Sequence, residues 1–553
     1  MLKFLLIFVL TTLLVYCLWL LPNLNVGAQS ALTSKIRSVS YSPFRRGQSP
    51  EAGVFPSKTE MESDIALLSK SVKNIRIYSG SNALGDIPEL AEKQGLTVWL
   101  GAWLDSNHET NLTEIEALVN LANRYPQTIT RVIVGNENLH RMDLTPAQLR
   151  DYLIQVKESI VQPVSYADGW EYWLDHSEIA DAVDIITVHI LPYWEQTPKA
   201  VEELGSHVGD ILSKVSKRYP DKPLAIGEIG WPTFGRSRKE AIPGIPEQAQ
   251  LIAEVHSLAQ KMHLDYNIIE AFDQPWKGIT EGSAGAYWGL FTAEREAKHE
   301  LGAKSERYPN WQKWFALSAI GAMIFAFATV FTSKMPLSTW KLLGISVISY
   351  VLLSLIVLSG LYLSYAQAPW IKWTIILMQL YFTYLLLVEV SRPTQADKKN
   401  TSIGETIANI RPQRRTLNNK PTTISLIYYC FTYIGLIVLW GMVLQSRYRD
   451  FPIVLFLVPA FGIWLSAIFS ANSVSDIGTS VIRILNMRQE KPSSPIKQRI
   501  GMFREETFTV VALCLGAILV INGEGIDNLE AVWFSLTFIV LASPYLGMLL
   551  SRK

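Results

Sequence analysis

The feature that most constrains the fold of this chain is the uneven distribution of its apolar residues. Residues 312–553 consist mostly of long apolar runs, whereas residues 23–311 mix apolar and polar residues, and a separate apolar run occupies residues 4–21. A run of about 20 apolar residues can cross a bilayer as a helix. The 553-residue chain is therefore expected to contain an N-terminal anchor at residues 1–22, a globular domain at 23–311 and a polytopic membrane domain at 312–553.

The N-terminal run has two interpretations, a transmembrane anchor or a cleavable signal peptide. It follows Lys3 and is longer than the about 7–15 apolar residues that a signal peptide usually has. The small residues of the segment 26–28 (Val-Gly-Ala) would suit cleavage, but they lie several residues beyond the run. We expect an uncleaved anchor.

The membrane domain is predicted to add seven spans to this anchor, giving eight in all. They lie near residues 314–332, 340–363, 370–390, 422–445, 451–471, 507–523 and 530–550. Lys and Arg concentrate in the loops 391–421 and 472–506, whereas the loops 364–369 and 524–529 carry none. Because loops rich in Lys and Arg stay in the cytoplasm, both termini are expected there, with residues 23–311 on the opposite side.

Charge and reactive side chains exclude several functional classes. The net charge is +1 without a basic stripe, which argues against nucleic-acid binding. Cys17, Cys430 and Cys514 all fall in apolar runs, so the globular domain has no thiol or disulfide. The eight histidines of the globular domain form no His-Glu-x-x-His motif or other recognisable ligand cluster. We therefore expect neither a metal ion nor a cofactor.

Short apolar runs alternate with amphipathic segments along the globular domain. The candidate strands are Ile36–Tyr41, Asn74–Tyr78, Leu96–Gly101, Arg131–Gly135, Val161–Tyr166, Asp184–His189, Leu224–Glu228 and Asn267–Phe272. The candidate helices between them are Met61–Ser71, Glu114–Arg124, Pro146–Ile160, Val201–Tyr219 and Glu247–His263. This alternation over about 250 residues predicts an α/β fold, the (β/α)8 TIM barrel. The alternative, an open doubly wound sheet, lacks a Gly-rich phosphate motif after its first strand.

Two carboxylates are expected at the C-terminal rim of this barrel, where such folds carry their chemistry. Glu228 ends the run Leu224–Glu228, and Glu137 follows the fourth strand, directly after Gly135 and Asn136. Cleavage of a glycosidic bond requires a proton donor and a carboxylate facing the anomeric carbon, which two such residues supply. Glutamates at strand ends are common, so the pair alone has a purely structural alternative.

Tryptophans are frequent near the predicted strand ends. They are Trp99, Trp103, Trp170, Trp173, Trp194, Trp231, Trp276 and Trp288. Their flat rings suit stacking on sugar faces, and burial between barrel and helices is the alternative for each of them.

The chain resembles the family 17 glycoside hydrolases, which act on β-1,3-glucans. The segments Val134–Glu137 (Val-Gly-Asn-Glu) and Ile226–Pro232 (Ile-Gly-Glu-Ile-Gly-Trp-Pro) are similar to the two signature motifs of that family. Similar segments follow in the expected order at Ser40–Phe44, Ile75–Tyr78, Ala271–Lys277 and Tyr287–Phe291. The resemblance covers residues 35–300 and none of the membrane domain.

The resemblance implies a retaining mechanism in which Glu137 is the acid/base and Glu228 the nucleophile. Retention requires carboxyl groups about 5–5.5 Å apart. Asn136 is implied to bind the sugar near the reacting centre, with a strand-capping amide as the alternative. The other candidate substrate-binding residues are Tyr41, Arg76, Tyr78, Asp168, His189, Tyr193, Trp231, Phe272, Trp276 and Trp288. Ion pairing for Arg76, core packing for Tyr78, a satisfied rim position for His189 and an Asx turn for Asp168 are the structural alternatives.

Two departures from the plant-type pattern point to another branch of the family. Ile229 follows the predicted nucleophile where plant-type members have Ser, and Gln274 stands where they have Glu, so an auxiliary carboxylate is expected to be missing. These features are similar to the bacterial membrane-anchored branch with β-1,6-glucan synthase-type proteins. The resemblance implies a multi-pass protein of the cell inner membrane with a periplasmic catalytic domain.

A glucanosyltransferase that elongates or branches β-1,3-glucans is therefore the expected function, with a β-1,3-glucan hydrolase as the alternative. A processive glycosyltransferase is disfavoured because the cytoplasmic loops lack Asp-x-Asp and Gln-x-x-Arg-Trp motifs. Transport is disfavoured because Gln379 is the main polar residue at mid-depth of a span. A catalytically silent glucan-binding or export accessory protein is the non-enzyme alternative. The expected partners are the glucan, the lipid bilayer and a glucan synthase or exporter.

Overall fold

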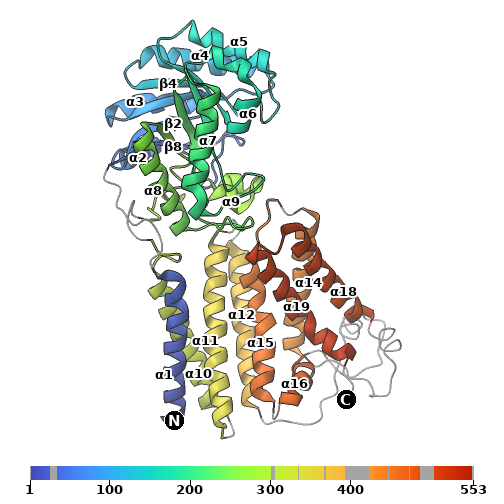
Figure 1. Ribbon diagram of the computed structural model, residues 1–553. Helices are drawn as coiled ribbons and strands as arrows, with labels where there is room; N and C mark the ends of the chain where they lie inside the picture. Colours follow the sequence, from blue (N-terminus) through green and yellow to red (C-terminus); the bar gives the residue numbers. More distant parts are fainter. Residues whose placement is uncertain are drawn as a thin grey trace. The chain divides into compact units, whose positions relative to one another are not determined.

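The computed structural model describes residues 2–24, 34–299, 305–333, 336–365, 369–392, 422–445, 447–471, 474–485 and 504–550. The chain divides into two compact units. One is Asn25–Pro309, and the other joins Met1–Leu24 to Asn310–Lys553. The N-terminal helix thus groups with the C-terminal helices (Figure 1).

The first unit is a closed barrel of eight parallel strands in the order β1 to β8, which confirms the predicted fold. The strands are β1 (Ile36–Ser40), β2 (Val72–Ile77), β3 (Thr97–Ala102), β4 (Ile129–Asn136), β5 (Val164–Gly169), β6 (Ile185–His189), β7 (Leu224–Ile229) and β8 (Asp265–Ile268). The helices around them are α2 (Lys58–Leu68), α3 (Ile87–Lys93), α4 (His108–Arg124), α5 (Pro146–Lys157), α6 (Trp170–Asp175), α7 (Leu204–Arg218), α8 (Ile245–Met262) and α9 (Gly282–Ala286). Because helices cover the outside of the sheet, most strand residues are buried, including polar ones such as Ser38, Asn74 and Asn267 in β1, β2 and β8.

Two predicted strand boundaries are corrected by the structure. β5 begins at Val164 rather than Val161, since Val161 is exposed and Pro163 has no N–H to donate. β8 ends at Ile268 rather than Phe272. The chain beyond it pairs with a later segment, in which the N–H groups of Leu290 and Phe291 donate to the carbonyls of Glu270 and Ala271.

The second unit contains eight helices, among the described residues, that are long and apolar enough to cross a membrane. They are α1 (Leu2–Leu20), α10 (Trp311–Thr332), α11 (Thr339–Tyr362), α12 (Pro369–Ser391), α14 (Thr423–Leu444), α15 (Ile453–Ser470), α18 (Arg504–Glu524) and α19 (Leu529–Leu550). A short helix, α16 (Ile477–Ile484), lies in the predicted basic loop 472–506. The rest of that loop and most of the loop 391–421 lie outside the described residues, as do residues 26–28.

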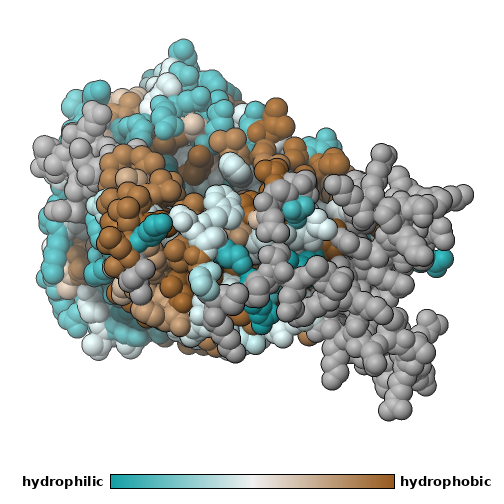
Figure 2. Space-filling model, turned by 90° about the horizontal axis from the view of Figure 1, so that it is seen from below, coloured by the Kyte–Doolittle hydropathy of each residue, from teal (hydrophilic) through white to brown (hydrophobic). Residues whose placement is uncertain are grey.

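Apolar side chains are exposed along these helices. Leu6, Leu14, Ile324, Trp370 and Ile437 are among them, each at least half exposed. The face drawn in Figure 2 shows apolar side chains gathered in broad patches on the helices. An exposed apolar surface of this extent is typical of helices that face lipid.

The N-terminal helix α1 packs on α11 through specific contacts. Thr12 Oγ1 lies 2.5 Å from the Tyr350 hydroxyl, and Trp19 Nε1 donates to Ser354 Oγ at 3.3 Å. The ring of Phe8 lies 4.9 Å from that of Tyr350. Hydrogen bonds between helices of this kind are typical of packed membrane spans.

Candidate active site

Strand β7 places the carboxylate of Glu228 at the C-terminal rim of the barrel. Gly227 precedes it, where an added Cβ would lie 2.7 Å from Thr187 Cγ2 and 2.9 Å from His189 Cδ2. The absence of a side chain at Gly227 therefore lets β6 and β7 approach closely. The Gly227 carbonyl accepts hydrogen bonds from Arg76 Nη1 at 2.7 Å and Asn267 Nδ2 at 2.9 Å.

Glu137 is placed on the same rim by the turn that ends β4. Gly135 has φ +83° and Glu137 has φ +53°, both in the left-handed region. An added Cβ on Gly135 would also lie 2.4 Å from the Asn138 side chain. The Glu137 N–H donates to the Ala167 carbonyl at 2.8 Å, which ties the turn to β5.

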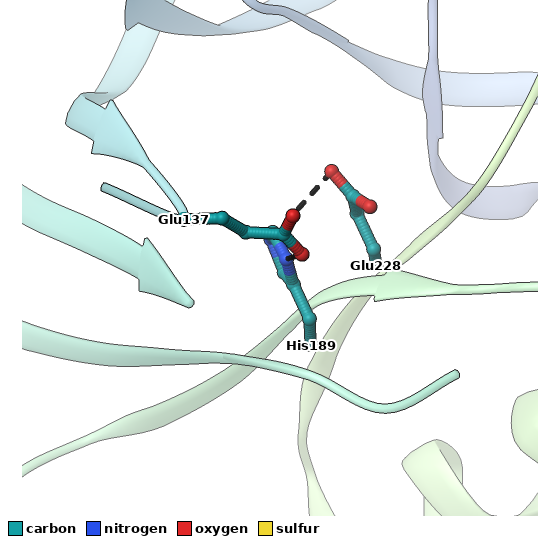
Figure 3. Close-up of side chains that lie close together, drawn as sticks. All are labelled: Glu137, His189 and Glu228. Carbon is teal, nitrogen blue, oxygen red and sulfur yellow. Dashed lines mark hydrogen bonds and ion pairs between the residues drawn. The ribbon is translucent and has the colours of Figure 1, made fainter. Parts of the chain in front are cut away.

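The two carboxylates converge around His189 (Figure 3). One carboxylate oxygen of Glu137, one of Glu228 and a ring nitrogen of His189 all lie within 4.8 Å of one another. Glu228 is 5% exposed, whereas the Glu137 side chain keeps a quarter of its surface accessible. Two carboxylates this close suit the geometry of a retaining site, in which one of them attacks the sugar directly.

Arg76 and Tyr78 hold the Glu228 carboxylate. Arg76 Nη1 lies 3.2 Å from Glu228 Oε1, and the Tyr78 hydroxyl donates to the same oxygen at 2.8 Å. Arg76 Nη2 also donates to Asn136 Oδ1 at 2.6 Å. Burial and the negative charge of Glu228 raise the pKa of Tyr78 well above its ordinary value, so its phenol stays protonated as a donor.

His189 connects the two carboxylates. Its Nδ1 lies 2.8 Å from Glu137 Oε1, and its Nε2 lies 3.6 Å from Glu228 Oε1. Burial alone would raise the pKa of Glu137, but the hydrogen bond and positive charge of His189, followed by the charges of His140 and Arg141, lower it to about 2. In the free site Glu137 is therefore ionised, and its Oε1 is hydrogen-bonded to His189 Nδ1.

Glu137, His189 and Glu228 also have the donor types of a metal site, which sequence reasoning did not predict. The contacts favour acid/base chemistry instead. The Arg76 guanidinium already supplies a positive charge at Glu228 Oε1, and a cation at the centre of the three groups would be repelled by it.

Several predicted substrate-binding residues are not brought to the carboxylate pair. The Tyr41 hydroxyl points to Asp64, the Tyr193 hydroxyl donates to the Arg236 carbonyl and Trp231 Nε1 donates to the Ile242 carbonyl. All three side chains are at most 1% exposed. Phe272 and Trp288, which were also predicted to bind substrate, are buried as well, so the prediction of an exposed aromatic surface at these positions is corrected.

Two further candidates have structural partners. Asp168 is fully buried and accepts hydrogen bonds from the Tyr166 hydroxyl, the Gly169 N–H at 2.7 Å and the His140 N–H at 3.3 Å. These contacts support the turn near Glu137 rather than a direct sugar contact. Trp276 is partly exposed, and its Nε1 donates to Gln274 Oε1 at 2.8 Å.

Sequence reasoning missed a buried charged cluster beside β8. Lys277 Nζ donates to both carboxylate oxygens of Glu270 at 3.1 and 3.2 Å, and Lys298 Nζ donates to Asp273 Oδ1 at 2.6 Å. Burial raises the pKa of Glu270 to about 7 and that of Asp273 to about 6, although the lysines oppose both shifts. The acidic residues flanking Phe272 were the available signal, but their burial could not be read from it.

Comparison with known proteins yields matches to about half of the chain. Residues 38–289 match the family model of the BtgE/BtgC glycoside hydrolase domain. A glucan 1,3-beta-glucosidase of Saccharomyces cerevisiae is 26% identical over 295 residues, covering 48% of this chain and 93% of that protein. A glucan 1,3-beta-glucosidase of Schizosaccharomyces pombe is 29% identical over 261 residues, covering 44% and 80%.

Solved structures also align with about half of the chain. An active-site mutant of Rhizomucor miehei beta-1,3-glucanosyltransferase in complex with laminaritriose aligns over 49% of this chain and 97% of its own. The two are 22% identical, with a TM-score of 0.43. An endo-laminarinase from Formosa aligns over 50% and 88%, at 20% identity and the same TM-score.

Proposed function

We propose that the chain is a retaining β-1,3-glucanosyltransferase whose barrel is a glycoside hydrolase domain of the family 17 type. The observation that carries this proposal is the approach of Glu137, Glu228 and His189 to within 4.8 Å of one another. The relatives named as glucan 1,3-beta-glucosidases support the substrate class.

The first chemical step transfers a glucosyl unit to the enzyme. A Glu228 oxygen attacks the anomeric carbon as the glycosidic bond breaks, and the Glu137–His189 pair gives its proton to the departing oxygen. The 2.8 Å contact between Nδ1 and Oε1 lets the proton move onto Glu137 as bound sugar displaces water from the carboxylate. Arg76 and Tyr78 keep Glu228 oriented for attack.

The second step returns the enzyme to its starting state. An acceptor hydroxyl gives its proton to the Glu137–His189 pair and attacks the anomeric carbon, which releases Glu228. A sugar hydroxyl as acceptor gives transfer, and water gives hydrolysis. We propose a sugar acceptor, because an enzyme tethered to a membrane can stay beside a growing glucan.

Product analysis tests this choice. The full chain in detergent is incubated with laminaripentaose, and the products are separated by length and analysed for linkage. Transfer predicts oligosaccharides longer than the substrate, including β-1,6-linked ones if the enzyme branches. Products that are only shorter than the substrate would identify a β-1,3-glucan hydrolase, the function favoured by the names of the relatives. The Glu228→Gln variant serves as the inactive control.

We further propose that the eight apolar helices hold the barrel at the outer face of the cell inner membrane, with both termini cytoplasmic. The Lys- and Arg-rich loops support this orientation, and the contacts of α1 with α11 support an anchor that is not cleaved. Val161→Cys would place a thiol on a barrel that has none. Labelling of this variant in intact spheroplasts by a membrane-impermeant maleimide is expected, and labelling only after lysis would reverse the orientation.

A further inference from the structure

Trp103 is the large aromatic side chain that the barrel leaves most exposed among its described residues. It follows β3 and is 42% exposed, whereas Trp231 and Trp288 are buried. Its ring lies edge-on to Tyr78, with the centroids 6.4 Å apart at 70°. Tyr78 in turn donates to the Glu228 carboxylate, so one side chain separates Trp103 from the nucleophile.

The Trp103 ring is also held in place. The Arg141 guanidinium lies over the ring, 4.5 Å from a ring centroid. Arg141 is itself fixed by Asp143 at 2.7 Å, by the Leu104 carbonyl at 3.0 Å and by the Asn136 carbonyl. The guanidinium therefore joins Trp103 to the backbone next to Glu137.

The backbone beneath the ring is restrained from a second direction. The Trp103 N–H donates to Glu114 Oε2 at 3.2 Å, and Glu114 Oε1 accepts from Ser79 Oγ at 2.8 Å and from Ser81. An exposed tryptophan in a barrel needs no such support for folding. A rigid ring with one face covered by a cation and the other side open to solvent is suited to binding a ligand.

We propose that Trp103 is a stacking platform for a glucosyl unit adjoining the unit that becomes attached to Glu228. The apolar C–H face of a β-linked glucose is flat and matches the open side of the indole ring. The assignment rests on the function proposed above. It makes Trp103 a residue that recognises glucan chain length, with no part in the bond-making steps.

Binding to a catalytically silent enzyme tests the platform. The full chain carrying Glu228→Gln is titrated calorimetrically with laminaripentaose, alone and combined with Trp103→Ala, Trp103→Phe or the control Val161→Ala. Trp103→Ala is expected to raise Kd by about tenfold or more, equivalent to about 1.4 kcal/mol. Trp103→Phe is expected to recover most of the affinity, and Val161→Ala to leave it unchanged.

The outcomes separate this inference from the proposed function. If Glu228→Gln binds no laminari-oligosaccharide, the β-1,3-glucan substrate is wrong and the platform falls with it. If Glu228→Gln binds and Trp103→Ala binds equally well, only the platform is wrong. In the active enzyme, Trp103→Ala is expected to raise KM for laminaripentaose at least about tenfold with kcat and the pH profile nearly unchanged. A fall in kcat with KM unchanged would contradict a binding role.

Discussion

Arg76 Nη1 lies 3.2 Å from Glu228 Oε1, and both side chains are almost completely buried. The same guanidinium donates to the Gly227 carbonyl and to Asn136. It therefore fixes the proposed nucleophile Glu228, the strand that carries it and Asn136, which precedes the proposed acid/base, in one arrangement. A buried pair with further hydrogen bonds is the geometry in which an ion pair specifies position.

Arg76→Lys is expected to lower kcat/KM at least about 100-fold. An ammonium group cannot reach all of these acceptors, so the Glu228 carboxylate is expected to move away from the position required for attack. Arg76→Met leaves Glu228 unpaired and should cost about 3–5 kcal/mol of unfolding free energy. Kinetics and denaturant unfolding of the barrel check the two effects. Arg37→Lys, at an exposed ion pair with Asp265, is the matched control and should change neither. Near-normal kinetics for Arg76→Lys would contradict the positioning role.

Removal of the proposed acid/base, Glu137, is expected to slow the reaction by an amount that depends on the leaving group of the substrate. Glu137→Ala is expected to lower kcat on laminaripentaose by about 100- to 10,000-fold, since no proton reaches the departing sugar. An aryl glucoside with a dinitrophenol leaving group should still glycosylate Glu228. Added azide should then accelerate turnover and yield a β-glycosyl azide, detected by mass spectrometry and NMR. An α-azide would contradict retention.

His189→Gln is expected to shift the pH profile. In the wild type, the hydrogen bond and charge of His189 help lower the pKa of Glu137 to about 2. Without His189 these two influences are lost, and burial raises the pKa of Glu137. Because the protonated form of Glu137 then persists to higher pH, the alkaline limb of kcat/KM should move to higher pH.

The matched control is His207→Gln. His207 Nε2 also contacts a carboxylate, Glu195, at 2.8 Å, but neither residue contacts the catalytic pair. Its pH profile is expected to coincide with that of the wild type. An unchanged alkaline limb in His189→Gln would show that His189 does not lower the pKa of Glu137.

Glu270 is expected to make the barrel more stable in mild acid. Its pKa rises from 4.5 to about 7 on folding, so the native state binds more protons between these values. The free energy of unfolding should therefore decrease by on the order of 2–3 kcal/mol as pH rises from about 4.5 to 7. Asp273, with its pKa raised from 3.8 to about 6, adds a change of the same sign at lower pH.

Thermal unfolding of the barrel, followed by near-UV circular dichroism at several pH values, measures this dependence. Glu270→Gln mimics the protonated acid and is expected to flatten the upper part of the curve. Glu62→Gln alters an exposed carboxyl on α2 and should preserve the wild-type curve. An equal slope in wild type and Glu270→Gln would contradict the assignment.

The barrel and the proximity of Glu137 to Glu228 were predictable because both depend on local patterns. Short runs containing β-branched residues alternate with helical segments, and the C-terminal ends of all eight parallel strands meet at one rim. Glu137 and Glu228 follow such runs, so topology alone brings them together. The apolar helices were predictable for the same reason, since each has the length and composition of a span by itself.

The exposure of individual side chains was not predictable, since it depends on how the rim segments cover one another. Trp231 and Trp103 both follow strand ends in the sequence, but Trp231 is buried whereas Trp103 is exposed. The segment from Trp288 to Phe291 pairs with the chain beyond β8, a long-range contact of the kind that decides such exposure. The Glu270–Lys277 pair is likewise formed by a chain reversal after β8. Such contacts join segments whose pairing no local pattern encodes.

The left-handed backbone at Glu137 puts catalysis and stability in opposition at one position. A non-glycine residue at φ +53° carries a conformational cost of about 1–3 kcal/mol, and asparagine tolerates that region better than glutamate does. Glu137→Asn is therefore expected to yield a barrel that unfolds at higher temperature and turns over no substrate. Selection for stability alone would replace Glu137 with a residue that tolerates this backbone conformation better. The presence of glutamate at this position is therefore explained by selection for activity.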